Sequence, residues 1–125
     1  MNRSLILAGL VLPFIAACAI TPEAGKPAEV TGMLSDVVVA NRSATGILTV
    51  DGKPVEGKVV AIQSGKRTVR FLALPIPGHR GGEVKSLDLN VKPCTRYYIN
   101  AQRQNARTLD WEPVIGKEEP MAGCK

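Results

Sequence analysis

Residues 45–74 read TGILTVDGKPVEGKVVAIQSGKRTVRFLAL, and this stretch decides the fold class. Its apolar runs are short and rich in β-branched residues, and two turn signals, Asp51-Gly52 and Ser64-Gly65, separate them. Connections this short predict antiparallel pairing, because parallel strands need long crossovers. We therefore expect strands at 46–50, 55–62 and 68–74, with a hairpin at each turn signal.

The strand pattern continues toward the C-terminus. In residues 84–91 the apolar side chains alternate with polar ones, so one face of this strand is expected to be buried. The same test on residues 95–104 predicts that Tyr97, Ile99 and Ala101 point inward and that Arg96, Tyr98, Asn100 and Gln102 point outward. Further strands are expected at 34–40 and near 112–115. The predicted fold is all-β, a small antiparallel β-sandwich over residues 33–125.

Composition limits the classes of protein that remain. The chain has 125 residues, of which 45% are hydrophobic, as is normal for one globular domain. The formal net charge of +5 favours encounters with anionic surfaces such as phospholipid headgroups or acidic glycans. Nucleic acid is not an expected partner, because no nucleic-acid-binding module accompanies the lysines and arginines.

A separate apolar stretch, LILAGLVLPFIAAC, occupies residues 5–18. Its apolar core is too short for a spanning helix, which needs roughly twenty residues, and it follows a head that carries Arg3. This arrangement is typical of a secretory signal peptide. The motif IAAC at 15–18 resembles the lipobox of bacterial lipoproteins, in which the cysteine is acylated and becomes the mature N-terminus. The resemblance implies a signal peptide at 1–17 and a lipid anchor on Cys18.

The resemblance also implies a location in the cell. Ala19 stands where an aspartate would resemble an inner-membrane retention signal, so we expect the outer membrane, with the domain facing the periplasm. The following residues are mostly small or polar and include prolines, so 18–32 is expected to be the lipidated cysteine and a flexible linker. The expected partners are the membrane, through Cys18, and an unknown envelope protein or anionic glycan.

Two cysteines remain once Cys18 is assigned to lipid. In an oxidising compartment Cys94 and Cys124 are expected to form a disulfide, and intermolecular pairing is the main alternative. A metal pair or a redox couple is disfavoured, because there is no CxxC spacing and the only histidine, His79, lies in a distant glycine-rich stretch. The bond would fasten a C-terminal tail that could hardly pack alone.

Residues 50–101 resemble a PEGA-type β-sandwich domain. The similar features are a strand into a DGK turn, a second strand, the glycine-led strand GKRTVRF, a glycine-containing loop, and an alternating strand leading through Lys92-Pro93 to TRYYIN. From Cys94 to the end, the segments PCTRYYINAQ, DWEPV and EEPMAGC are similar to uncharacterised proteobacterial lipoproteins. The resemblance implies an Ig-like sandwich and supplies no activity.

No catalytic set is visible in the sequence. His79 has no cysteine, aspartate or second histidine at a useful spacing, and its glycine-rich surroundings are typical of a hairpin tip. Gly78, Gly81 and Gly82 lack the spacing of a phosphate-binding loop. The serines lack the context of a nucleophile elbow. We expect no enzyme activity, no cofactor and no metal site.

The remaining candidate is a basic face. Arg96, Tyr98, Arg103 and Arg107 are the candidate partner-binding residues, and Lys66, Arg67 and Arg70 would join them if the strands are neighbours. Arginine suits acidic groups because its planar guanidinium binds them in pairs of hydrogen bonds. An ordinary solvated sheet face is the alternative. Trp111 is interpreted as a core residue rather than a binding platform.

These expectations support one leading hypothesis and two alternatives. The leading hypothesis is a non-enzymatic, membrane-anchored envelope lipoprotein that binds or scaffolds another envelope component. The first alternative is a binding module for an anionic glycan or lipid headgroup. The second is an inhibitor of a cell-wall hydrolase such as lysozyme, although the basic charge argues against it, because lysozymes are commonly basic.

Overall fold

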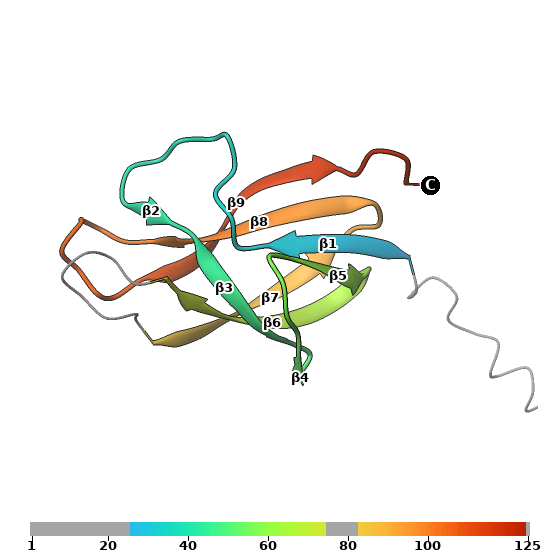
Figure 1. Cartoon of the computed structure of the whole chain (residues 1–125), viewed down its shortest axis with the longest axis horizontal. Helices are drawn as coiled ribbons and strands as arrows, with labels where there is room; N and C mark the ends of the chain where they lie inside the picture. Colours follow the sequence, from blue (N-terminus) through green and yellow to red (C-terminus); the bar gives the residue numbers. More distant parts are fainter. Residues whose placement is uncertain (1–25, 75–82, 125) are drawn as a thin grey trace, which may run out of the picture.

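The structure, a computed structural model, describes residues 26–74 and 83–124. These residues form two sheets and no helix, so the predicted all-β sandwich is confirmed (Figure 1). Cys18, His79 and the three glycines at 78, 81 and 82 lie outside the described residues. The strands are β1 Pro27–Thr31, β2 Arg42–Ser43, β3 Thr45–Val50, β4 Lys53–Pro54, β5 Val59–Gln63, β6 Gly65–Ala73, β7 Val84–Val91, β8 Thr95–Gln102 and β9 Glu112–Pro120.

Strand β8 organises the five-stranded sheet. It pairs with β9 along one edge and with β1 and then β2 along the other, while β5 pairs with the far side of β1. The four-stranded sheet has the order β4-β3-β6-β7. All of these pairs are antiparallel except β1 with β8, which run in parallel over Glu29–Thr31. The single parallel pair departs from the expected all-antiparallel pairing.

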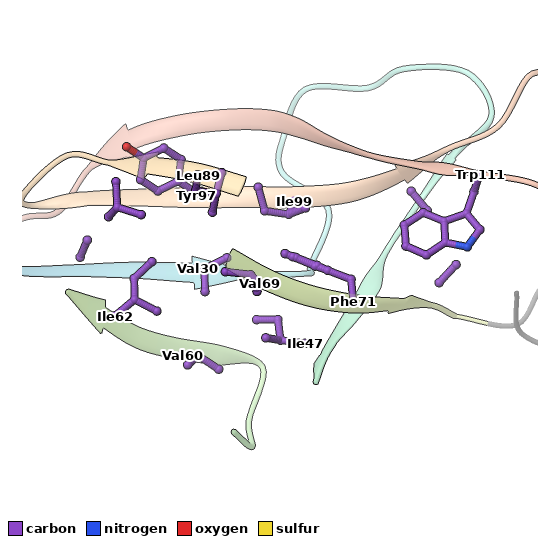
Figure 2. Close-up of a cluster of buried hydrophobic side chains, with 14 residues drawn as sticks. Val30, Ile47, Val60, Ile62, Val69, Phe71, Leu89, Tyr97, Ile99 and Trp111 are labelled. Atoms are coloured by element: carbon purple, nitrogen blue, oxygen red, sulfur yellow. The ribbon is translucent and has the colours of Figure 1, made fainter. Parts of the chain in front are cut away.

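The core lies between the two sheets (Figure 2). Val30 and Ile99 from one sheet meet Val69 and Phe71 from the other, and all four side chains are completely buried. Tyr97 is also buried, and its hydroxyl accepts a hydrogen bond from the Lys92 backbone N–H at 2.8 Å. Burial of Tyr97, Ile99 and Ala101 confirms the predicted inward face of β8.

Trp111 lies just before β9 and is 1% exposed. Its indole Nε1 donates a hydrogen bond to the backbone carbonyl of Glu83 at 3.0 Å, so the one polar group of the ring has a partner. Trp111 is therefore a core residue, as predicted. It lies at the opposite end of β9 from Cys124, so it does not pack against the disulfide-bonded tail.

The two turn signals give different structures. Asp51 and Gly52 both have positive φ, 50° and 82°, as a two-residue hairpin between β3 and β4 requires. Ser64-Gly65, in contrast, does not close a hairpin, because β5 belongs to the five-stranded sheet and β6 to the four-stranded sheet. It is a corner between the sheets. The strand expected at 55–62 is correct only in its second half, because residues 55–58 connect β4 of one sheet to β5 of the other and the strand begins at Val59.

Two expectations near the N-terminus are wrong. Residues 27–31 were expected to belong to a linker but form β1, because Ala28 and Val30 are buried and the strand is paired on both edges. Residues 34–40 were expected to be a strand but form an irregular connection between β1 and β2. At the other end of the chain, the short strand expected near 112–115 extends to Pro120, because it pairs with the whole of β8.

A disulfide joins Cys94, in the turn between β7 and β8, to Cys124 near the C-terminus. Their Cα atoms are 5.5 Å apart, within the usual range for a disulfide. The backbone N–H of Met121 also donates to the carbonyl of Cys94 at 2.9 Å. The bond therefore fastens the C-terminal tail to the sheet, as the sequence predicted.

Candidate functional site

Arg96 and Tyr98 lie on the outer face of the five-stranded sheet, as predicted. In register with Arg96 are Glu29 on β1 and Glu119 on β9. The Arg96 guanidinium contacts the Glu29 carboxylate at 2.8 Å and the Glu119 carboxylate at 3.4 Å. The Tyr98 hydroxyl donates to Glu119 at 2.7 Å. We call Glu29, Arg96, Tyr98, Lys117 and Glu119 the charge ladder.

The charge ladder neutralises itself. The hydrogen bond from Tyr98, together with the positive charges of Lys117 and Arg96, lowers the pKa of Glu119. Lys117 binds Asp36 at 2.8 Å, which raises the pKa of Lys117 and lowers that of Asp36. Because the Arg96 guanidinium already contacts two carboxylates, a further anion would be repelled by both of them.

The other predicted members of the basic face lie elsewhere. Arg103 is only 5% exposed and donates to the Ser43 hydroxyl at 2.7 Å. Arg107 is exposed in the connection between β8 and β9. Arg67 and Arg70 lie on β6, which belongs to the opposite sheet. The structure therefore does not bring these arginines together on one accessible face.

The connection between β1 and β2 carries a surface feature that the sequence analysis missed. Residues 33–40, which we call the apolar loop, read MLSDVVVA, and all but Ser35 are exposed. Val38 is 93% exposed, Leu34 51% and Val37 45%. Figure 1 shows this segment as a wide loop that leaves the sheets at the end of β1 opposite to Lys26. Several exposed apolar side chains in one short loop are typical of a recognition surface.

Hydrogen bonds hold the beginning of the apolar loop in one place. The Asn100 amide on β8 donates to the carbonyl of Gly32 at 3.1 Å and to that of Met33 at 3.0 Å. The Thr31 hydroxyl donates to the Lys58 carbonyl at 2.6 Å and accepts from the Met33 N–H at 3.2 Å. Further along, the ion pair between Asp36 and Lys117 ties the loop to β9.

Asn100 lies on the predicted face of β8 but is buried instead of solvated. Its position in β8 puts the side chain on the outer face, as predicted, but it is 1% exposed rather than solvated. The start of the apolar loop covers it from one side, and Gly116 of β9 approaches from another. A β-carbon at residue 116 would lie 2.5 Å from the Asn100 Oδ1, so glycine is needed there for a close approach.

A valine run without polar alternation was the signal that could have identified the apolar loop. Val37, Val38 and Val39 follow one another, whereas a strand with one solvated face alternates apolar and polar residues. The high β-propensity of valine favoured a strand instead. Propensity alone cannot show whether a run of valines finds a pairing partner.

Metal-binding clusters and membrane-spanning helices are both absent from the described residues. Within 26–74 and 83–124 there is no group of three His, Cys, Asp or Glu side chains that could hold a metal ion. The same ranges contain no helix that is long and apolar enough to cross a membrane. Comparison with models of protein families, with curated proteins and with solved structures gave no match in any of the three cases. The resemblance to PEGA-type domains therefore stays a prediction.

Proposed function

We propose that this protein is a non-enzymatic, lipid-anchored envelope protein that binds another envelope protein through the apolar loop. The anchor is the acylated Cys18 predicted by the lipobox, and the outer membrane, with the domain facing the periplasm, is its proposed location. The observation that carries the binding role is the ordered exposure of apolar side chains at residues 33–40.

Order and exposure together favour binding. An apolar side chain in water gains free energy when a partner covers it, by roughly 25 cal/mol per Å² of apolar surface buried. A loop that is already fixed loses less conformational entropy on binding than a disordered one. Asn100, Thr31 and the pair of Asp36 with Lys117 supply this fixation.

The partner is expected to present an apolar pocket or groove. Val38, the most exposed of these residues, would be its central contact. The only charged side chain in the apolar loop, Asp36, is paired with Lys117, so recognition by net charge is not supported. The cationic side chains of the charge ladder, Arg96 and Lys117, are likewise paired with carboxylates, so the charge ladder does not favour the anionic-glycan alternative.

A photo-crosslinking amino acid at position 38, introduced into the full chain in intact cells, tests the proposal. The expected result is a discrete crosslinked protein that disappears when Val37 and Val39 are also replaced by serine. Leu109 is the matched control position, because it is 48% exposed but lies in the connection between β8 and β9. No discrete product from position 38, or the same products from position 109, would contradict the binding role.

The anchor needs a separate measurement. Mass spectrometry of the protein purified from its membrane is expected to show acyl chains on Cys18 and no residues before it. An unmodified sulfur at position 18 would overturn the anchor and leave the binding role of the apolar loop to be judged by the crosslinking alone.

A further inference from the structure

One end of the sandwich collects the elements that lie nearest to the predicted anchor. The Ser64 N–H donates to the carbonyl of Lys26 at 2.9 Å, and the Cys94 N–H donates to that of Pro27 at 2.7 Å. The start of β1, the corner between β5 and β6, and the turn between β7 and β8 therefore lie together, and Figure 1 shows the C-terminus at the same end. We call this the tether end.

The tether end has a surface hollow lined by lysines. The hollow has a volume of about 620 Å³, and its lining includes Lys26, Lys66 and Arg67 together with Val91 and Pro93. Lys26 and Lys66 are exposed, and neither makes an ion pair with any described residue. Among residues 26–74 and 83–124, therefore, no carboxylate is paired with either ammonium group.

The neighbouring charges at the tether end are already satisfied. The Arg67 guanidinium donates to the carbonyls of Gln63 and Ser64 and to the Asp51 carboxylate, each at about 3 Å. Lys92 is paired with Glu118 at 2.8 Å. These bonds hold the backbone around the hollow without cancelling the two lysines.

One carboxylate, that of Asp88, offsets part of the positive charge of Lys26 and Lys66. Asp88 lines a smaller hollow beside Lys66, and it accepts a hydrogen bond from the Thr68 hydroxyl at 2.8 Å. Lys53, which is exposed and has no ion pair among the described residues, lines a neighbouring hollow together with Asp51 and Arg67. The tether end therefore keeps an excess of positive charge.

We propose that the tether end docks on the anionic phospholipid headgroups of the membrane that holds Cys18. This inference rests on the lipid anchor of the proposed function. Eight residue steps separate Cys18 from Lys26, and a fully extended chain of that length spans at most about 28 Å. Lys26 is thus always close to the bilayer, where each lysine near an anionic surface gains about 1 kcal/mol, or about fivefold in docked population.

Docking in this way also fixes where the apolar loop points. The loop begins after Thr31, at the end of β1 opposite to Lys26. With the tether end on the headgroups, the apolar loop is held away from the bilayer and toward the periplasm. The membrane contact and the proposed protein contact therefore use opposite ends of β1.

Amine footprinting of the natively processed, lipidated protein tests the inference. The protein is reconstituted in vesicles of phosphatidylcholine alone or with phosphatidylglycerol, and acylation of each lysine is followed by mass spectrometry. On phosphatidylglycerol we expect Lys26 and Lys66 to react at least about fivefold more slowly, with recovery at about 0.5 M salt. Lys58, exposed at the far end of β5, is the internal control and should not change.

Charge reversal supplies the second arm. In the wild-type protein Lys92, whose side chain is 68% exposed at the same end, should also react more slowly on phosphatidylglycerol. The Lys26→Glu/Lys66→Glu variant should lose this protection of Lys92, whereas Lys58→Glu/Arg70→Glu, with the same change in net charge, should keep the protection of Lys26 and Lys66. Circular dichroism verifies that both variants fold. Equal lysine reactivity on the two vesicle types, protection on phosphatidylcholine alone, or protection by a soluble acidic glycan would overturn the inference. A failure of the anchor would look different, because the protein would not remain with either vesicle.

Discussion

Replacing Asn100 with alanine is expected to destabilise the sandwich and release the apolar loop. The substitution removes two hydrogen bonds from the side-chain amide, to the carbonyls of Gly32 and Met33. Gly32 keeps the bond from the Thr45 N–H at 2.9 Å, and Met33 is exposed, so its carbonyl regains water. At about 1 kcal/mol for each bond, we expect the free energy of unfolding to fall by about 2 kcal/mol.

The expected effect has a global and a local part. Urea unfolding followed by the fluorescence of Trp111 measures the free energy of unfolding. Hydrogen exchange measures the local effect. After correction for global stability, we expect Asn100→Ala to accelerate exchange of the amides in residues 34–40, relative to the wild type, more than that of the amides in β6. Asn90→Ala is the control, since the Asn90 side chain is exposed and makes no hydrogen bond within the described residues; it should change stability by less than about 0.5 kcal/mol.

A double-mutant cycle with Gly116 tests the reasoning most directly. In the wild-type protein Gly116→Ala would push a β-carbon to 2.5 Å from the Asn100 Oδ1, which is too close for an ordinary contact. We expect a cost of about 1–3 kcal/mol. In the Asn100→Ala background the obstructing atom is gone, so the cost should fall by about 1 kcal/mol or more. If the two substitutions add within about 0.5 kcal/mol, Asn100 is not the residue that requires glycine at 116, and our account of this site is wrong.

Three further predictions concern the disulfide, an unsatisfied hydroxyl and the charge ladder. Cys94→Ala/Cys124→Ala should lower the free energy of unfolding by up to about 3.6 kcal/mol in the chain-entropy model, and a urea midpoint equal to that of the wild type would contradict this. Thr49→Val should be neutral or stabilising by up to about 1 kcal/mol in thermal unfolding, because the Thr49 hydroxyl is buried with no hydrogen-bond partner in the described structure. Since the pKa of Glu119 is lowered in the folded state, its contribution to stability is present above the unfolded pKa and is lost as pH falls through the folded value. Tyr98→Phe removes the main cause of this shift, so the loss of stability on acidification should become shallower in unfolding curves, and an unchanged acid limb would count against the ladder.

Local chemistry made part of the fold predictable. The hairpin at Asp51-Gly52 needs positive φ at both residues, and this preference is encoded in the dipeptide itself. The inward face of β8 follows from alternation within one strand. The corner at Ser64-Gly65 was assigned to a hairpin because Gly65, with φ of 109°, has the same backbone freedom in either structure. Whether two strands pair after a turn depends on distant partners.

The other incorrect predictions also arose because the structure of a segment depends on partners that are distant in the sequence. Residues 27–31 have a linker-like composition, yet they form a central strand because β5 and β8 supply partners on both edges. Residues 34–40 have a strand-like composition, yet they pair with no strand in the described part of the chain. The outward position of Asn100 was predicted, but its burial depends on a segment 67 or more positions earlier in the chain. Strand pairing and burial that involve distant segments therefore could not be predicted from the local sequence.

If the proposed anchor on Cys18 is present, β1 connects the anchored end of the domain to the apolar loop. A pull from that anchor directed along β1 would load the ladders to β5 and β8 together, because they lie on either side of the strand and their hydrogen bonds run across it. The bond from the Cys94 N–H to Pro27 lies where the load enters, next to the disulfide. The five residues of β1, paired on both edges, therefore separate the proposed tether end from the proposed binding loop.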